Sequence, residues 1–314
     1  MILSPAIVTI MILNLLFAFF GWVALVLSLR IARYWDSNAT TKRQYQLEKQ
    51  SYLGATIIKF IFIIKLPLFA FFVYTLDGIS HLLTGAMCAA GVVDATREGL
   101  PLLILKIANI YLFGLWLVLH YRDMRFETLP FTRLKFGLFI GGFVLLMAEI
   151  YLEIAMFSAI DVDKIVSCCG SLYSSSSTSH LSHLFSLSNR AVVVAFYGAF
   201  ALLFSLYWLK NRYLFALSNL IFLFVSIVSL ILFFAPYIYE LPTHHCPFCI
   251  LQRDYYYTGY LLYILLFVGT FYGISLIANP QKRGYNVSLI ANSLYALMVS
   301  GYVLRYYWVN GVWL

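Results

Sequence analysis

Long runs without a charged residue are the feature of this sequence that most restricts its fold. Residues 1–29, 191–209, 213–239, 255–281 and 284–304 contain no Asp, Glu, Lys or Arg. A helix of about 20 apolar residues crosses the hydrocarbon core of a bilayer, which is about 30 Å thick. Each of the five runs is therefore expected to hold one transmembrane helix.

Three further apolar stretches are interrupted by one or two charges. They are 57–77 with Lys65, 101–120 with Lys106, and 136–158 with Glu149 and Glu153. Together with the uninterrupted runs, they predict an all-α, polytopic integral membrane protein with about eight transmembrane helices.

The composition excludes several other classes of protein. Hydrophobic residues make up 62% of the chain and charged residues only 11%, whereas roughly a quarter of a soluble domain is charged. A soluble globular enzyme, a disordered regulator and a disulfide-stapled secreted module are therefore excluded. The net charge of +8 is attributed to basic residues that orient the chain in the membrane and contact anionic lipid headgroups. It does not indicate nucleic acid as a partner.

The basic residues predict how the chain is oriented. Arg30 and Arg33 follow the first apolar run, and basic residues after a first span hold that end in the cytoplasm. The N-terminus is then extracytoplasmic, and with eight spans the C-terminus is extracytoplasmic too. The expected location is the inner (cytoplasmic) membrane of the cell.

We expect residues 1–314 to form a single transmembrane domain. Within it, 1–158 and 190–314 are candidate halves, joined by the outer loop 159–189, whose Ser-rich composition is typical of a loosely packed segment. Residues 78–100 are long enough to contain a short interfacial helix between two spans.

All five cysteines fall in loops predicted to face outside the cytoplasm. They are Cys88, Cys168, Cys169, Cys246 and Cys249. Free structural cysteines are also common inside apolar helices, so this segregation is informative. It indicates thiol or metal chemistry on the side of the membrane where disulfides persist.

The strongest motif is the run HHCPFCILQR, residues 244–253. Two cysteines separated by two residues can form a disulfide, whether redox-active or a structural clip, or can bind one soft metal ion together. We expect a transmembrane helix to begin within a few residues of Cys249, which would favour a reactive thiolate there.

The segment CPFCILQR resembles the CxxCxx(Q/E)R signature of the DsbB-type disulfide-generating oxidases, which are related to vitamin K epoxide reductase. The resemblance covers about 20 residues. It implies a thiol/disulfide oxidoreductase that passes electrons from extracytoplasmic thiols, supplied by a thiol or redox protein partner, to a membrane quinone.

The resemblance also implies roles for individual residues. Cys249 would be the thiol on the quinone side, Cys246 the exchanging thiol, and Arg253 a quinone-binding residue. Gln252 and Tyr256 are further candidates for the quinone site. The second exchanging cysteine would come from Cys88, Cys168 or Cys169.

Two other classes of function stay open. His244, His245, Cys246 and Cys249 supply nitrogen and sulfur ligands suited to Cu or Zn, as in a soft-metal transporter or a maturation factor. Alternatively, the chain is a non-catalytic membrane anchor subunit of a redox complex, with loops clipped by disulfides.

The charges inside the apolar stretches form a separate candidate site. Glu149 and Glu153 are four residues apart and share one helix face, and Lys106 is expected at the same depth. Because a lone charge inside a membrane is costly, these residues are expected to pair, either as a structural ion pair or on a proton or substrate path. Lys65, beside Pro67, has no obvious acidic partner in the sequence.

Overall fold

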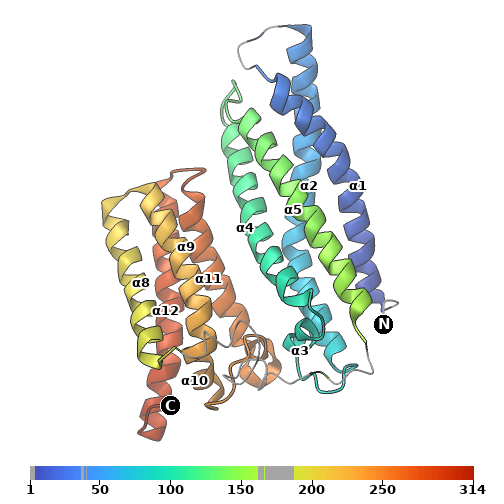
Figure 1. Ribbon diagram of the computed structural model, residues 1–314. Coiled ribbons are helices and arrows are strands. Elements are labelled where there is room, and N and C mark those ends of the chain that lie inside the picture. Colours follow the sequence, from blue (N-terminus) through green and yellow to red (C-terminus); the bar gives the residue numbers. More distant parts are fainter. Residues whose placement is uncertain (1–3, 37–38, 40, 162–165, 167–186) are drawn as a thin grey trace. The chain divides into compact units, whose positions relative to one another are not determined.

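The computed structural model describes residues 4–36, 39, 41–161, 166 and 187–314, and the regular structure in these ranges is helical throughout. Eight helices there are long and apolar enough to span a membrane (Figure 1). The prediction of an all-α, multi-pass membrane protein is thereby confirmed.

The chain forms two compact units, the first made of residues 1–84 and 92–165 and the second of residues 85–91 and 166–314. The long helices of the first unit are α1 (Pro5–Tyr34), α2 (Lys42–Ser80), α4 (Gly99–Asp123) and α5 (Thr132–Ala159). They pack as a ring in which α1 contacts α2, α2 contacts α4, α4 contacts α5, and α5 contacts α1.

The second unit contains four spans in the same ring order. Its elements are α8 (Asn189–Leu209), α9 (Arg212–Ser229), η1 (Leu230–Phe234), α10 (Ala235–Tyr239), η2 (Cys249–Leu251), η3 (Arg253–Tyr255), α11 (Thr258–Ser275) and α12 (Lys282–Asn310). Helix α8 contacts α9, α9 contacts α11, α11 contacts α12, and α12 contacts α8.

The sixth span changes its winding before it ends. It is α-helical over α9, π-helical over η1 and α-helical again over α10. Pro236 lies at the start of α10, and a proline cannot donate the backbone hydrogen bond that a continuous α-helix needs. A short π-helical insertion accommodates such an interruption, and the span then ends only a few residues before Cys246.

Two local expectations have different outcomes. A short helix lies within 78–100, as expected: it is α3 (Ala89–Asp94). The transmembrane helix expected to begin within a few residues of Cys249 begins later, since α11 starts at Thr258. Cys249 is instead the first residue of the short 3₁₀ helix η2. Tyr256 and Tyr257 both adopt the left-handed conformation, with φ of 53° and 55°, which prevents a continuous helix from running through them.

A buried ion pair fastens the turn between α4 and α5 in the first unit. Asp123 Oδ2 accepts from Lys135 Nζ at 2.6 Å and from Thr132 Oγ1 at 2.7 Å. Its other oxygen accepts from the backbone N–H of Phe131 at 2.7 Å. Every donor comes from the neighbouring turn or from the start of α5, so this pair has the character of a structural clamp.

A polar cluster joins α9 to α12 inside the second unit. Asn219 Oδ1 accepts from Ser288 Oγ and from Asn292 Nδ2, both at 2.9 Å. Gly273 of α11 faces this cluster, and a Cβ atom added there would lie 2.2 Å from Asn219 Cγ. The missing side chain at residue 273 is what lets α11 approach the buried amide.

We expect Gly273→Ala to lower the midpoint of thermal unfolding of the detergent-solubilised chain. The added methyl group must displace Asn219 or push α11 outward, and overpacking of this kind costs about 1–3 kcal/mol. Gly301→Ala is the matched control, because a Cβ there meets nothing within 4 Å. Equal midpoints for the two variants would contradict the assignment of residue 273 as a close contact.

Candidate functional site

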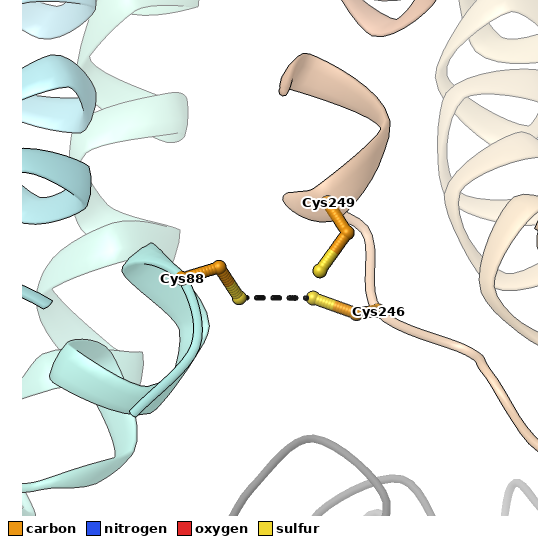
Figure 2. A group of neighbouring side chains, drawn as sticks. All are labelled: Cys88, Cys246 and Cys249. Carbon is orange, nitrogen blue, oxygen red and sulfur yellow. Dashed lines mark hydrogen bonds between the residues drawn. The ribbon is translucent and has the colours of Figure 1, made fainter. Parts of the chain in front are cut away.

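Three buried cysteines gather in the second unit. The Sγ atoms of Cys88, Cys246 and Cys249 all lie within 4.8 Å of one another, and the exposed fractions of the three residues are 0%, 0% and 5%. Cys88 Sγ is 3.5 Å from Cys246 Sγ. Figure 2 shows Cys88 pointing at Cys246, with Cys249 directed into the same space.

Two tyrosines hold the backbone of the CPFC motif. The hydroxyl of Tyr239, at the end of α10, donates to the carbonyl oxygen of Cys246. The hydroxyl of Tyr263, in α11, donates to the carbonyl oxygen of Pro247. Two spans of the second unit thus position the motif, because a buried carbonyl without a donor would destabilise the fold.

The second half of the motif is a tight turn packed on α11. The N–H of Leu251 donates to Phe248 O at 2.9 Å, and the N–H of Gln252 donates to Cys249 O at 3.0 Å. A Cβ on Gly259 would lie only 2.9 Å from the carbonyl carbon of Ile250. This close approach at the start of α11 holds the turn, and with it Cys249, against the helix bundle.

Cys88 reaches the motif from a distant part of the sequence. The segment 85–91 begins at Gly85, whose φ of 94° is readily adopted only by glycine. Gln252 Nε2 donates to Met87 O at 3.3 Å, so a residue of the HHCPFCILQR run holds the segment that carries Cys88. Cys88 O in turn accepts from the N–H of Gly91 at 3.0 Å, at the start of α3.

The two histidines of the motif have different surroundings. His244 packs edge-on against the Tyr239 ring at 4.3 Å between centroids, and its Nε2 is buried without a hydrogen-bond partner. Burial lowers the pKa of the His244 imidazole, so this side chain is neutral at pH 7. His245 instead donates its Nδ1–H to the carbonyl of Ile231 in η1, at 2.9 Å.

The residues that the resemblance assigns to a quinone lie next to the thiols in sequence but are more exposed. Arg253 is exposed, and Tyr256 is 89% exposed with its backbone in the left-handed region. Gln252 combines partial exposure with its contact to Met87. Cys168 and Cys169 lie outside the described residues.

Sequence reasoning named all five cysteines as candidates but did not single out Cys88. It is 158 positions from Cys246, and nothing in the local sequence around either residue indicates the contact. It did not name Tyr239, and it interpreted Tyr263 as part of an interfacial aromatic belt, whereas both donate to backbone carbonyls of the motif. Their aromatic, interfacial character in the sequence gives no sign of that function.

The charged residues inside the spans meet within the first unit. Lys106 Nζ lies 3.0 Å from Glu149 Oε1 and 3.0 Å from Glu153 Oε1. The expectation that Lys65 lacks an acidic partner is wrong, since Lys65 Nζ lies 3.0 Å from Glu149 Oε1. Lys65 is on α2 and Glu149 on α5, so only the packing of the helices shows the pair.

The thiol cluster supports two kinds of chemistry. The Sγ atoms of Cys88 and Cys246 need to approach each other by only about 1.5 Å to reach the S–S bond length of about 2.05 Å. Three thiolates at these separations also suit a soft metal ion: Zn–S bonds of about 2.3 Å place tetrahedral sulfur ligands about 3.8 Å apart.

Comparisons with protein-family models, curated proteins and solved structures give no match for this chain.

Proposed function

We propose that this membrane protein is a thiol/disulfide oxidoreductase that transfers electrons from the thiols of a partner protein to a membrane quinone. The observation that carries the proposal is the contact between Cys88 and Cys246, with Sγ atoms 3.5 Å apart. Cys246 thereby has two thiol neighbours, Cys88 and Cys249, so a disulfide is able to move between them.

The cycle uses one disulfide shared among three cysteines. Oxidation of Cys246 and Cys249 by the quinone forms their disulfide and gives the quinol, with two electrons and two protons transferred. The Cys88 thiolate then attacks Cys246 Sγ, which forms the Cys88–Cys246 bond and releases the Cys249 thiolate. A partner dithiol reduces the Cys88–Cys246 disulfide, leaves as a disulfide, and restores all three thiols.

The environment of the motif supports this assignment of roles. Cys249 is followed within four residues by Arg253, whose exposed guanidinium is available to bind a quinone oxygen. Gln252 and Tyr256 complete the proposed quinone site. In this proposal the cysteine loops face the extracytoplasmic side of the inner membrane, where a thiol or redox protein partner delivers electrons.

Binding of a soft metal ion is the second candidate function. All three Sγ atoms lie within 4.8 Å of one another, and His244, two residues before Cys246, has a buried Nε2 without a hydrogen-bond partner. Thiolates and imidazole are ligands preferred by Cu⁺ and Zn²⁺. A metal at this place would assign the protein to metal transport or to maturation of a metalloprotein.

One preparation of the full chain in lipid tests both functions. Thiols are alkylated and mapped by mass spectrometry, metals are measured by elemental analysis, and quinone is extracted from the same sample. A disulfide at Cys246 that a dithiol reduces and a quinone analogue restores, together with bound quinone, is the expected result. Reduced cysteines with about one equivalent of Cu or Zn favour the metal function instead.

The control is the double variant Cys168→Ser, Cys169→Ser, which removes the other two cysteines. Its disulfide state and quinone content should equal those of the unchanged chain. A disulfide that neither quinol nor a dithiol reduces, without bound quinone or metal, would contradict both functions and favour a non-catalytic anchor subunit.

A further inference from the structure

A closed ring of polar side chains lies inside the first unit, and it is independent of the proposed thiol chemistry. Glu149 Oε1 accepts from Lys65 and from Lys106, each at 3.0 Å. Lys106 also pairs with Glu153 at 3.0 Å. Asn14 closes the ring, since its Nδ2 donates to Glu153 Oε2 at 2.7 Å and its Oδ1 accepts from Lys65 at 3.2 Å.

The ring is built by four different spans and is removed from water. Asn14 is on α1, Lys65 on α2, Lys106 on α4, and Glu149 and Glu153 on α5. None of these residues is more than 4% exposed. Two positive and two negative charges cancel, as is required for ionised groups that are buried within a membrane.

A small cavity opens beside this ring. It is lined by Lys65, Lys106, Asn109 and Glu149 on one side, and by apolar side chains of α2 and α4 on the other. The space available to the centre of a water molecule is about 10 Å³, which is about the size needed for one water.

Asn109 gives the cavity an unsatisfied acceptor. Its Nδ2 donates to Glu149 Oε2 at 2.6 Å, but its Oδ1 is buried without a hydrogen-bond partner, and the residue is only 1% exposed. A buried carbonyl oxygen of this kind is stabilised by a donor. A single water in the cavity would supply that donor.

We propose that this ring is a proton-exchange site, at which Lys65 gives a proton to a water molecule in the cavity and takes it back. Among the two lysines of the ring, Lys106 contacts two carboxylates and Lys65 contacts one. Loss of the proton from Lys65 leaves Glu149 still paired with Lys106, so it costs less electrostatic energy than loss of the proton from Lys106.

The exchange balances without any redox partner. The Lys65 ammonium and water give the Lys65 amine and hydronium, and the reverse step restores the ring. The charged and polar groups that face Lys65 are Asn14 from α1, Lys106 and Asn109 from α4, and Glu149 and Glu153 from α5.

Nitrogen NMR of the lysine side chains tests this in the full chain reconstituted in lipid vesicles. The Nζ resonance of an ammonium differs from that of an amine, and Lys65→Arg identifies the resonance of Lys65 while keeping a positive charge. We expect that resonance to convert from ammonium to amine between mildly acidic and mildly alkaline buffer, and to be lost in Lys65→Arg.

Lys135 is the matched control, because it is also buried and paired with one carboxylate, Asp123. Its resonance, identified with Lys135→Arg, should stay that of an ammonium over the same range of buffers, because loss of its proton would leave Asp123 without its paired cation. If Lys65 also stays an ammonium, or if the converting resonance survives in Lys65→Arg, the proposal is wrong. Should Lys65→Arg fail to fold, the test uses Asn109→Leu, which fills the cavity and keeps Lys65. It is expected to slow hydrogen–deuterium exchange of the lysine resonance that converts with pH, and unchanged exchange would overturn the proposal.

Discussion

Replacement of Glu149 by leucine is expected to destabilise the first unit by about 3–5 kcal/mol, the cost of removing one partner from a buried ion pair. Glu149 holds Lys65, Lys106 and Asn109 through its two oxygens. Without it, Lys65 retains the amide oxygen of Asn14 as its acceptor within the ring. The measurement is the midpoint of thermal unfolding in detergent or lipid.

A charge-balanced variant separates the loss of pairing from the loss of packing. Lys65→Met combined with Glu149→Met removes one charge of each sign and leaves the Lys106–Glu153 pair intact. We expect this double variant to be more stable than Glu149→Leu, because apolar replacement of a whole buried pair is often close to neutral.

The control for the same chemical change is Glu127→Leu. Glu127 is an exposed residue in the turn that follows α4, and changes at such positions usually alter stability by less than about 0.5 kcal/mol. If Glu149→Leu is no less stable than Glu127→Leu, the ring does not hold the four helices of the first unit together.

The second large effect concerns the thiols. In a chain that already carries Cys168→Ser and Cys169→Ser, the further change Cys249→Ser is expected to leave Cys88 and Cys246 joined by a disulfide under mild oxidation. Their sulfur atoms are already in contact at 3.5 Å, and Cys249, the thiol that would resolve this bond by exchange, is missing. Mass spectrometry of the joined peptides after proteolysis measures the fraction that is bonded.

Cys88→Ser in the same background is the matched variant. It leaves Cys246 and Cys249, so the expected product is the disulfide within the CPFC motif. Both variants should lose the transfer of electrons from a dithiol to a quinone analogue, since each forms one disulfide but has no third thiol for the exchange. Free thiols at residues 88 and 246 in oxidised Cys249→Ser would contradict the proposed cycle.

The spans illustrate what periodicity and charge alone can establish. The charge-free runs 191–209 and 284–304 correspond to α8 and α12 of the structure. The boundaries are readable because a charged side chain in hydrocarbon is costly wherever it occurs in the chain. The same reasoning fails at Cys249, because the start of α11 depends on two left-handed tyrosines whose conformation leaves no mark on hydropathy.

Sequence reasoning paired Lys106 with Glu149 and Glu153 from their equal depth, as the structure confirms, but it did not find the partner of Lys65. The spacing of Glu149 and Glu153 places them on one face of a helix, and their pairing with some cation follows from the cost of burial. That Lys65 shares Glu149 with Lys106 depends on how α2, α4 and α5 pack together. No pattern in three separate segments determines such packing.

By itself, the sequence determined that the chain is helical and that it has about eight segments long and apolar enough to span a membrane. Those properties depend on transfer of side chains from water to lipid and on local spacing, which act residue by residue. Only the tertiary structure decided that Cys88 meets Cys246 and that four spans close a ring of opposite charges. Contacts between residues far apart in the chain arise from the packing of whole helices, and the chain's local chemistry does not contain that information.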